Sequence, residues 1–361
     1  MCMSYINKRF KITVYIIILI LIIIFSKFST NNLYASTYQI KDVSLIKPYD
    51  LNFKKIVVIE NAFKLAFDEL VSKITFSENK NIFENTDIEN IKKLIDSFSI
   101  TEEKFINDNY SAKFEVNFNK KNVQNFMNSK NVFTSIPIEK KIFLLPILLD
   151  NNQKEVFLFS ENDFYNNWDN NIKKYHLLDY IKPNEDLDDI NTIKKNLENI
   201  EDYNFKNIIS KYNLKDYIIA IIFRENKNIK VLSKVNFNNK PSIINHKFEN
   251  SVFENSLYVE KIIDTLKLSY ENEWKKQNQI NSSIKLPLTI SIDSKNYKLI
   301  DKFEKSLISS DLIAKFYIES ITNKYTIYKI IYNATPDKFL LEFNNHGFEI
   351  DISKEVWSLN E

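Results

Sequence analysis

The sequence predicts an α+β protein made of two or three small α/β-sandwich units, the C-terminal one ferredoxin-like, after an N-terminal signal or anchor helix. Three observations support this prediction. Apolar residues recur at helical spacing over 56–74, whereas residues 110–118 alternate between apolar and polar, which is typical of a half-buried strand. The last third of the chain shows strand and helix patterns in the order β-α-β-β-α-β.

An uncharged apolar segment, residues 12–26, is flanked by basic residues on both sides. As a helix it would span about 22 Å, which is short of the roughly 30 Å hydrocarbon core of a bilayer. Two interpretations follow. Either residues 1–35 are a signal peptide that is cleaved after Ala35, or they stay as an inner-membrane anchor with the basic end inside. Both place residues 36–361 outside the cytoplasm, in the periplasm of the cell envelope.

The composition excludes several classes of enzyme. The chain has one glycine, and the Walker loop, the dinucleotide-binding turn and the nucleophile elbow of hydrolases each need more than one. Its single cysteine, Cys2, allows no intramolecular disulfide and precedes the apolar segment. With no cluster of cysteine and histidine, the sequence predicts no cofactor.

The exported part of the chain is nearly neutral. Residues 1–35 hold four basic and no acidic residues, so the remainder carries 45 basic and 47 acidic residues, a net of −2. A neutral, exported body argues against nucleic acid as a partner. The expected partner is an envelope protein or another envelope component, together with the inner membrane if the N-terminal segment is uncleaved.

The first unit, residues 38–149, is predicted to be an α+β domain. Asparagine and aspartate are expected in its hairpin turn because they tolerate positive φ better than other non-glycine residues. The expected elements are a strand at 38–47, helices at 56–74 and 87–98, a turn at 107–109, a strand at 110–118, a helix at 122–127 and a buried strand at 141–149.

The middle unit, residues 150–248, alternates strand and helix patterns, which favours an α/β arrangement. Its expected elements are an apolar stretch at 156–159, a helix at 164–175, a segment at 177–183, helices at 188–200 and 204–212, and strands at 217–223 and 229–237.

The last unit, residues 251–361, begins with a long helix and continues as the ferredoxin-like pattern. Gly347 follows the final helix, where a left-handed residue is expected, so we predict a positive φ there. The expected elements are helices at 251–277, 297–308 and 336–345 and strands at 284–292, 311–320, 324–333 and 348–352.

With these elements in order, residues 38–237 resemble a bacterial exported family known only as domain of unknown function 2066. No single motif is diagnostic; the order and spacing of several segments support the match. The resemblance implies a location in the envelope and no established activity, so it assigns no catalytic residue. The segments that carry it are the helix 56–74, Tyr110–Phe118, the helix with Val123 and Phe126, Ile142–Pro146, Trp168 and Ile181–Asp189.

An acidic run, Glu185 to Asp189, is the most suggestive polar cluster in the sequence. Asp186, Asp188 and Asp189 are candidate ligands for a divalent cation, because hard cations prefer oxygen. The simpler interpretation is structural: acidic residues at a helix start complement the helix dipole, and one aspartate caps the helix. We favour the cap and predict no metal.

Arg224 is the only arginine in the exported body, and it ends a strongly apolar strand. Its planar guanidinium can grip a carboxylate or phosphate with two hydrogen bonds, so it is a candidate ligand contact; the alternative is a structural ion pair. Trp168 is a second candidate, as one side of a groove for sugar or peptide. Tryptophans scattered as Trp168, Trp274 and Trp357 are more often part of cores or domain joints.

The three histidines, His176, His246 and His346, stand singly in the sequence. Each could act as a base in a site assembled in space, but none has a recognisable nucleophile beside it. We therefore expect structural or surface roles for them.

The leading hypothesis for function is a non-enzymatic binding or assembly module that contacts another envelope component through sheet edges or inter-domain clefts. The first alternative is an unrecognised periplasmic, hydrolase-like enzyme with a cleft between the first and middle domains. The second is a scaffold tethered to the inner membrane by residues 12–26. The catalytic residues of the enzyme alternative are unknown.

Overall fold

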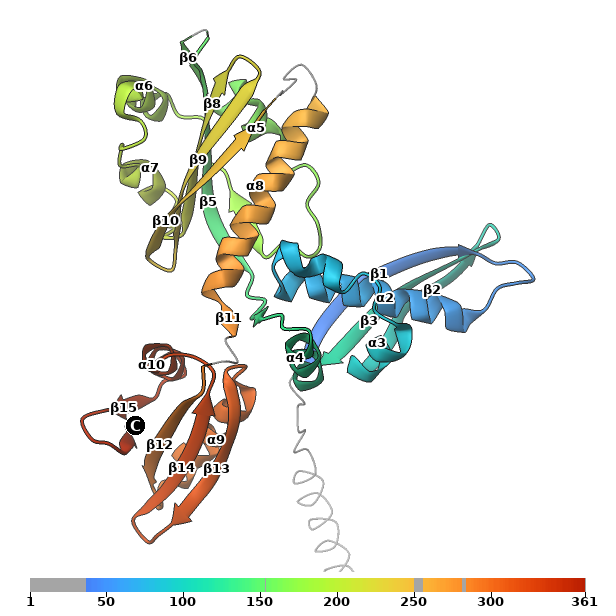
Figure 1. Cartoon of the computed structure of the whole chain (residues 1–361), viewed down its shortest axis with the longest axis vertical. Helices are drawn as coiled ribbons and strands as arrows, with labels where there is room; N and C mark the ends of the chain where they lie inside the picture. The colour runs from blue at the N-terminus through green and yellow to red at the C-terminus, as the bar shows by residue number, and fades with distance from the viewer. Residues whose placement is uncertain (1–36, 153, 250–255, 281–283, 361) are drawn as a thin grey trace, which may run out of the picture. The chain divides into compact units, whose positions relative to one another are not determined.

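The computed structural model describes residues 37–152, 154–249, 256–280 and 284–360 (Figure 1). The described residues from Tyr38 onward form one compact unit. The predicted signal or anchor helix, and the first turn of the helix predicted at 251–277, lie outside the described residues. Within the described ranges, no helix is both long and apolar enough to cross a membrane. The predicted α+β class is confirmed.

The first sheet has three strands in the order β1-β3-β2. Alternate residues of β3 are buried, as the sequence pattern predicts, and they pack against the apolar faces of α2, α3 and α4 in one core. The elements of this part are β1 (Thr37–Pro48), α2 (Lys55–Ile74), the 3-10 helix η1 (Ser77–Ile82), α3 (Ile88–Leu94), β2 (Ile95–Ile106), β3 (Asn109–Asn119) and α4 (Lys120–Ser129).

The helix predicted at 87–98 is too long. Helix α3 ends at Leu94, and β2 begins at the next residue. Strand pairing sets the end of the helix, because Ile95 lies opposite Phe118 and Phe98 lies opposite Val116 on β3. The sheet therefore takes the last four residues of the predicted helix. The turn at 107–109 has the expected positive φ at Asn107 and Asp108.

The largest sheet has six strands in the path β10-β9-β8-β5-β6, with β7 also paired to β5. Strand β5 is parallel to β7 and β8. Strand β9 is antiparallel to both of its neighbours, β8 and β10. The elements of this part are β5 (Lys140–Asp150), β6 (Glu155–Phe157), η2 (Phe159–Glu161), α5 (Asp163–Asn167), β7 (Leu178–Ile181), α6 (Leu187–Lys195), η3 (Leu197–Asn199), α7 (Lys206–Ser210), β8 (Tyr217–Glu225), β9 (Asn228–Phe237), β10 (Lys240–Phe248) and α8 (Ser256–Gln277).

Helices cover both faces of this sheet, as Figure 1 shows. One face packs against α5 and α8, and the other packs against α6 and α7. Strands β5 and β8 supply residues to both cores, for example Leu144 to the first and Leu145 to the second. Burial on both faces explains why these two strands are continuous apolar runs in the sequence.

Three helices predicted for this part are too long, and one strand was not predicted. The helix predicted at 164–175 is only α5, five residues long, and Asn171 beyond it has a left-handed φ of 57°. The two helices predicted at 188–200 and 204–212 are also shorter than expected. Strand β10 was not predicted at all, although it pairs with β9 along its whole length.

The last sheet has five strands in the order β13-β14-β12-β16-β15. Helices α9 and α10 pack on it in a separate core. Two short strands, β4 (Thr134–Ser135) and β11 (Gln279–Ile280), pair ahead of it. The elements are β12 (Leu286–Asp293), α9 (Tyr297–Ser309), β13 (Ile313–Ile321), β14 (Tyr325–Tyr332), α10 (Pro336–Asn345), β15 (Glu349–Asp351) and β16 (Trp357–Asn360).

The predicted β-α-β-β-α-β order is present in β12 to β15, and β16 is an addition to it. The chain turns back after β15, and β16 enters the sheet between β15 and β12, parallel to β12. Trp357 of β16 lies opposite Ile290 and packs on the C-terminal core. The chain therefore ends in a hairpin of two strands, β15 and β16, where the sequence predicted a single strand at 348–352.

Gly347 ends α10 with a φ of 76°, as predicted. The N–H of Gly347 donates to the carbonyl of Asn344, and the N–H of Phe348 donates to that of Phe343, which is the Schellman arrangement. We expect Gly347→Ala to lower the free energy of unfolding by about 1 kcal/mol, and Gly347→Asn to cost less, because asparagine tolerates this conformation. Urea unfolding of both variants measures the difference, and equal losses would contradict the conformational explanation.

Candidate functional site

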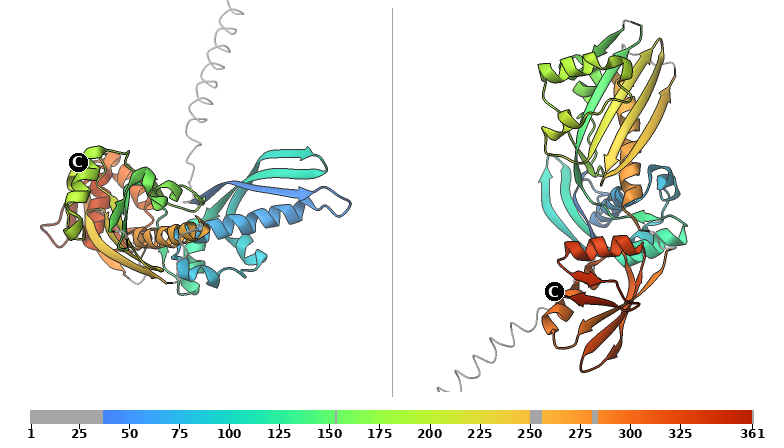
Figure 2. Two further views of the ribbon diagram at one scale, coloured as in Figure 1. Left: turned by 90° about the horizontal axis from the view of Figure 1, so that it is seen from above. Right: turned by 90° about the vertical axis from the view of Figure 1, so that its left-hand side faces the viewer.

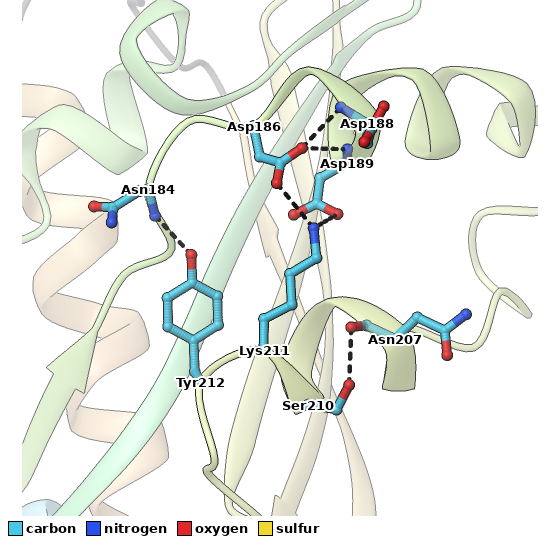
Figure 3. Close-up of polar contacts among 8 residues, drawn as sticks. All are labelled: Asn184, Asp186, Asp188, Asp189, Asn207, Ser210, Lys211 and Tyr212. Carbon is cyan, nitrogen blue, oxygen red and sulfur yellow. Dashed lines mark hydrogen bonds and ion pairs between the residues drawn. The ribbon is translucent and has the colours of Figure 1, made fainter.

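The acidic run begins helix α6, and Asp186 caps it (Figure 3). One oxygen of Asp186 accepts from the backbone N–H groups of Asp188 (2.8 Å) and Asp189 (3.2 Å). Lys211, just after α7, donates to Asp186 at 2.9 Å and to Asp189 at 2.7 Å. The cap that the sequence favoured is therefore present, and a lysine joins α6 to the end of α7.

The electrostatics of this cluster fit a structural ion pair. Hydrogen bonding from Lys211, with help from the backbone N–H groups of Asp189 and Asp188, lowers the pKa of Asp186, and the two carboxylates raise the pKa of Lys211. The lysine occupies the position between the carboxylates that a cation would take. In the part of the chain that the structure describes, no group of three histidine, cysteine or acidic residues is placed to hold a metal ion.

Arg224 stands at the end of β8, directly opposite Asp150 of β5. Its Nε donates to a carboxylate oxygen of Asp150 at 3.0 Å, and Nη2 contacts the same oxygen. Asp150 is almost fully buried, and the guanidinium lies 6.0 Å from the ring centre of Phe157. Arg224 thus joins two neighbouring strands at the sheet end through an ion pair.

Trp168 is fully buried between α5 and α8 and stacks on Tyr270, with ring centres 6.2 Å apart. Trp274 is also buried in this core, and Trp357 packs on the C-terminal one. Trp168 nevertheless lines a hollow of about 230 Å³, together with polar residues from the segment around β7. Its indole N–H has no hydrogen-bond partner among the described residues.

The three histidines lie in different parts of the fold. His176 lines the hollow beside Trp168, and burial, reinforced by Lys267 and other lysines, lowers its pKa to about 4. His246 lies on β10 and stacks on Phe248, and His346 is the C-cap of α10. The structure does not bring them together.

A row of buried charges on α8 is absent from the sequence predictions. Lys267, Glu271 and Lys275 follow each other at four-residue spacing on the helix and are each less than 5% exposed. Glu271 accepts from the backbone N–H groups of Leu177 and Leu178, both at 2.9 Å. Lys267 donates to the carbonyl of Asn170 at 3.0 Å. The spacing of the three charges within an apolar helix was the available signal.

Lys275 extends this row to the end of helix α2. Its ammonium donates to the carbonyl of Ser72 at 2.5 Å and to that of Thr75 at 3.0 Å. Burial lowers the pKa of Lys275 to about 8, against the opposing effect of Glu271. Burial likewise raises the pKa of Glu271. Together these groups bind the C-terminal end of α2 and the start of β7 to one helix.

Strand β10 forms an open edge of the central sheet. The two-residue turn at Asn238 and Asn239 has positive φ at both positions, which is the hairpin turn that fits strand twist. From this turn the pairing with β9 runs over nine residues without a register shift. Because hydrogen-bonded and non-hydrogen-bonded pairs alternate, residues 243, 245 and 247 direct their backbone N–H groups away from β9.

These outward groups are available for pairing in the described part of the chain. No hydrogen bond from another described element reaches the backbone N–H groups of Ile243, Asn245 and Lys247. The other long edge strands for which the register is defined, β2 and β13, each contain two register shifts. Such bulges are a common means of blocking an edge against further pairing.

A hollow of about 780 Å³ lies beside this edge, on the face of β8, β9 and β10 that α6 and α7 leave partly uncovered. Phe223 and Leu232 give it an apolar floor, and charged or amide side chains surround them. The polar lining residues are Asn151, Glu201, Glu225, Asn228, Lys230, Asn245, His246 and Lys247.

Comparison of the sequence with known protein families finds no matching family model. Comparison with curated proteins finds no similar protein. The resemblance to domain of unknown function 2066 therefore stays a prediction, and the arguments for function rest on the geometry.

Proposed function

We propose that this chain is an exported cell-envelope protein that acts as a binding or assembly module and takes up an extended segment of an envelope partner along β10. The observation that carries the proposal is the unbroken edge, with its outward N–H groups at Ile243, Asn245 and Lys247. An added strand satisfies such groups by backbone hydrogen bonds, which provide affinity without requiring one sequence.

The hollow beside β10 provides a means of selecting among partner segments by their side chains. Alternate side chains of an added strand point to the same face of the sheet. On one face they lie beside Ile243, Asn245 and Lys247 of β10, and the last two of these residues line the hollow. The proposal therefore favours a partner segment with apolar and polar side chains on one face, held antiparallel or parallel to β10.

The enzyme alternative has less support. It needs a cleft between the first and middle domains, and the cavity between the end of α2 and α8 measures about 40 Å³. A volume of this size accommodates a water molecule, whereas ligand sites usually occupy 300 Å³ or more. Lys275 and Glu271, which line the cavity, are engaged with backbone groups of the chain itself.

A photo-cross-linking residue at position 243 tests the proposal in the native envelope. Ile243 lies on β10 with its side chain 64% exposed, and Leu341 on α10 is exposed to the same degree, 63%. We expect a discrete cross-linked envelope product from position 243 and none of the same mass from position 341. Identical products from the two positions would contradict a site at β10.

A further inference from the structure

A second surface lies at one end of the three-stranded sheet, where the loop after β1, the start of α2 and the β2–β3 turn meet (Figure 2). Exposed apolar side chains gather there, and we call this group the apolar tip. Its members are Ile46, Tyr49, Leu51, Ile56, Phe105 and Ile106.

The apolar tip is held in shape by contacts between its segments. The backbone N–H of Tyr49 donates to the carbonyl of Asp108 at 2.7 Å, which joins the loop to the β2–β3 turn. The ring of Tyr49 lies 4.9 Å from that of Phe53 and 5.0 Å from that of Phe105. The exposed side chains therefore project from an ordered support.

Leu51 is the most prominent of these residues. It follows Asp50 in a turn closed by a hydrogen bond from the N–H of Phe53 to the carbonyl of Asp50 at 3.0 Å. Turn corners facing water are usually polar or glycine, yet the Leu51 side chain is fully exposed, at 105%. Because the turn projects outward, a partner must accept an apolar protrusion.

We propose that the apolar tip enters the interfacial layer of a lipid bilayer. A bilayer accepts a convex apolar protrusion of any shape, and aromatic and lysine side chains are favoured at its headgroup level. Lys47 and Lys54 lie on either side of the loop, exposed and with no ion pair among the described residues. Asp50 caps the turn by accepting from the N–H of Asn52. Leu51 enters deepest, and the lysines meet lipid phosphates.

The position of the tip in the chain is compatible with this contact. Ten residues, 27–36, separate the predicted signal or anchor segment from Thr37. Ten extended residues span at most about 36 Å, and β1, with 12 residues, is about 40 Å long. A chain still attached to the inner membrane can therefore bring the far end of β1 to the same bilayer.

Vesicle flotation with residues 36–361 tests the proposal. This form is suitable because residues 38–361 are one compact unit with their own cores, and because the segment 12–26 would insert by itself. The probe is a vesicle of phosphatidylcholine and phosphatidylglycerol in a 3:1 ratio. We expect the parent protein to co-float and Leu51→Glu to reduce the apparent partition coefficient at least about tenfold. Leu341→Glu, equally apolar in the parent and exposed elsewhere, is the matched control and should float like the parent.

Three results would overturn the proposal: no flotation of the parent protein, unchanged flotation of Leu51→Glu, or an equal loss in Leu51→Glu and Leu341→Glu. Both variants replace exposed side chains, and a far-ultraviolet circular dichroism melt verifies that each remains folded. Neither substitution touches β10, so the cross-linking from position 243 is a separate result.

Discussion

Replacing Glu271 with alanine is expected to lower the free energy of unfolding by about 3–5 kcal/mol, because removal of one member of a buried charged network leaves its partners uncompensated. The substitution removes the carboxylate that accepts hydrogen bonds from the backbone N–H groups of Leu177 and Leu178. The buried ammonium of Lys275 also loses the negative charge of Glu271, which favours its protonated form. Urea unfolding followed by the fluorescence of Trp168 and Trp274, which share this core, measures the loss.

Two matched variants isolate the role of Glu271. Glu271→Gln keeps an acceptor oxygen and should cost about half as much or less. Glu260→Ala, on the same helix, removes hydrogen bonds to the exposed side chains of Asn170 and Asn171 and should cost less than about 1 kcal/mol. A Glu271→Ala variant as stable as Glu260→Ala would show that the buried row does not hold α8 in place.

The second large effect is a dependence of stability on alkaline pH that comes from Lys275. Its pKa is about 8 in the folded protein and 10.5 in the unfolded chain. Between these values the unfolded chain binds one more proton, so the free energy of unfolding rises with pH. The rise is complete above pH 10.5 and absent below pH 8. Its size is about 3 kcal/mol.

Comparison with Lys275→Met separates this effect from other titrations. The charged or titratable groups around Lys275 are Glu271, Lys80, Tyr175 and His176, and all four remain in the variant. We expect the difference in unfolding free energy, parent minus variant, to grow in favour of the parent between pH 8 and 10.5. Parallel curves for the two proteins across this range would contradict a lowered pKa for Lys275.

Elements with a clear local pattern could be predicted from the sequence. The helical spacing of 56–74 and the alternation of 110–118 gave α2 and β3 nearly to the residue, because each element presents one face to a core. The same holds for the turn at 107–109 and for Gly347, where backbone conformation restricts the choice of residue. Pairing between distant strands was not predictable. Ile95 joins β2 because Phe118 lies opposite, and β16 is defined by its place beside β12.

The site shows the same division. The cap by Asp186 follows from local sequence, because an aspartate just before a helix accepts hydrogen bonds from the N–H groups of the first turn. Arg224 pairs with Asp150, and Lys211 pairs with Asp189. Each partner is far away in the sequence, so no local pattern identifies it. Strand β10 was missed because two adjacent isoleucines, Ile243 and Ile244, interrupt the alternation and its pattern is weak without β9.

The central claim, strand addition at β10, is tested most directly by a pair of substitutions at Asn245. Asn245→Pro removes an outward N–H that β9 does not use, and edge strands tolerate such a proline. Asn245→Ala removes the same side chain and keeps the N–H. With the photo-cross-linker at position 243, we predict that the product disappears in Asn245→Pro and persists in Asn245→Ala, while both variants unfold near the parent's midpoint. Equal yields from the two variants would contradict backbone pairing at this edge.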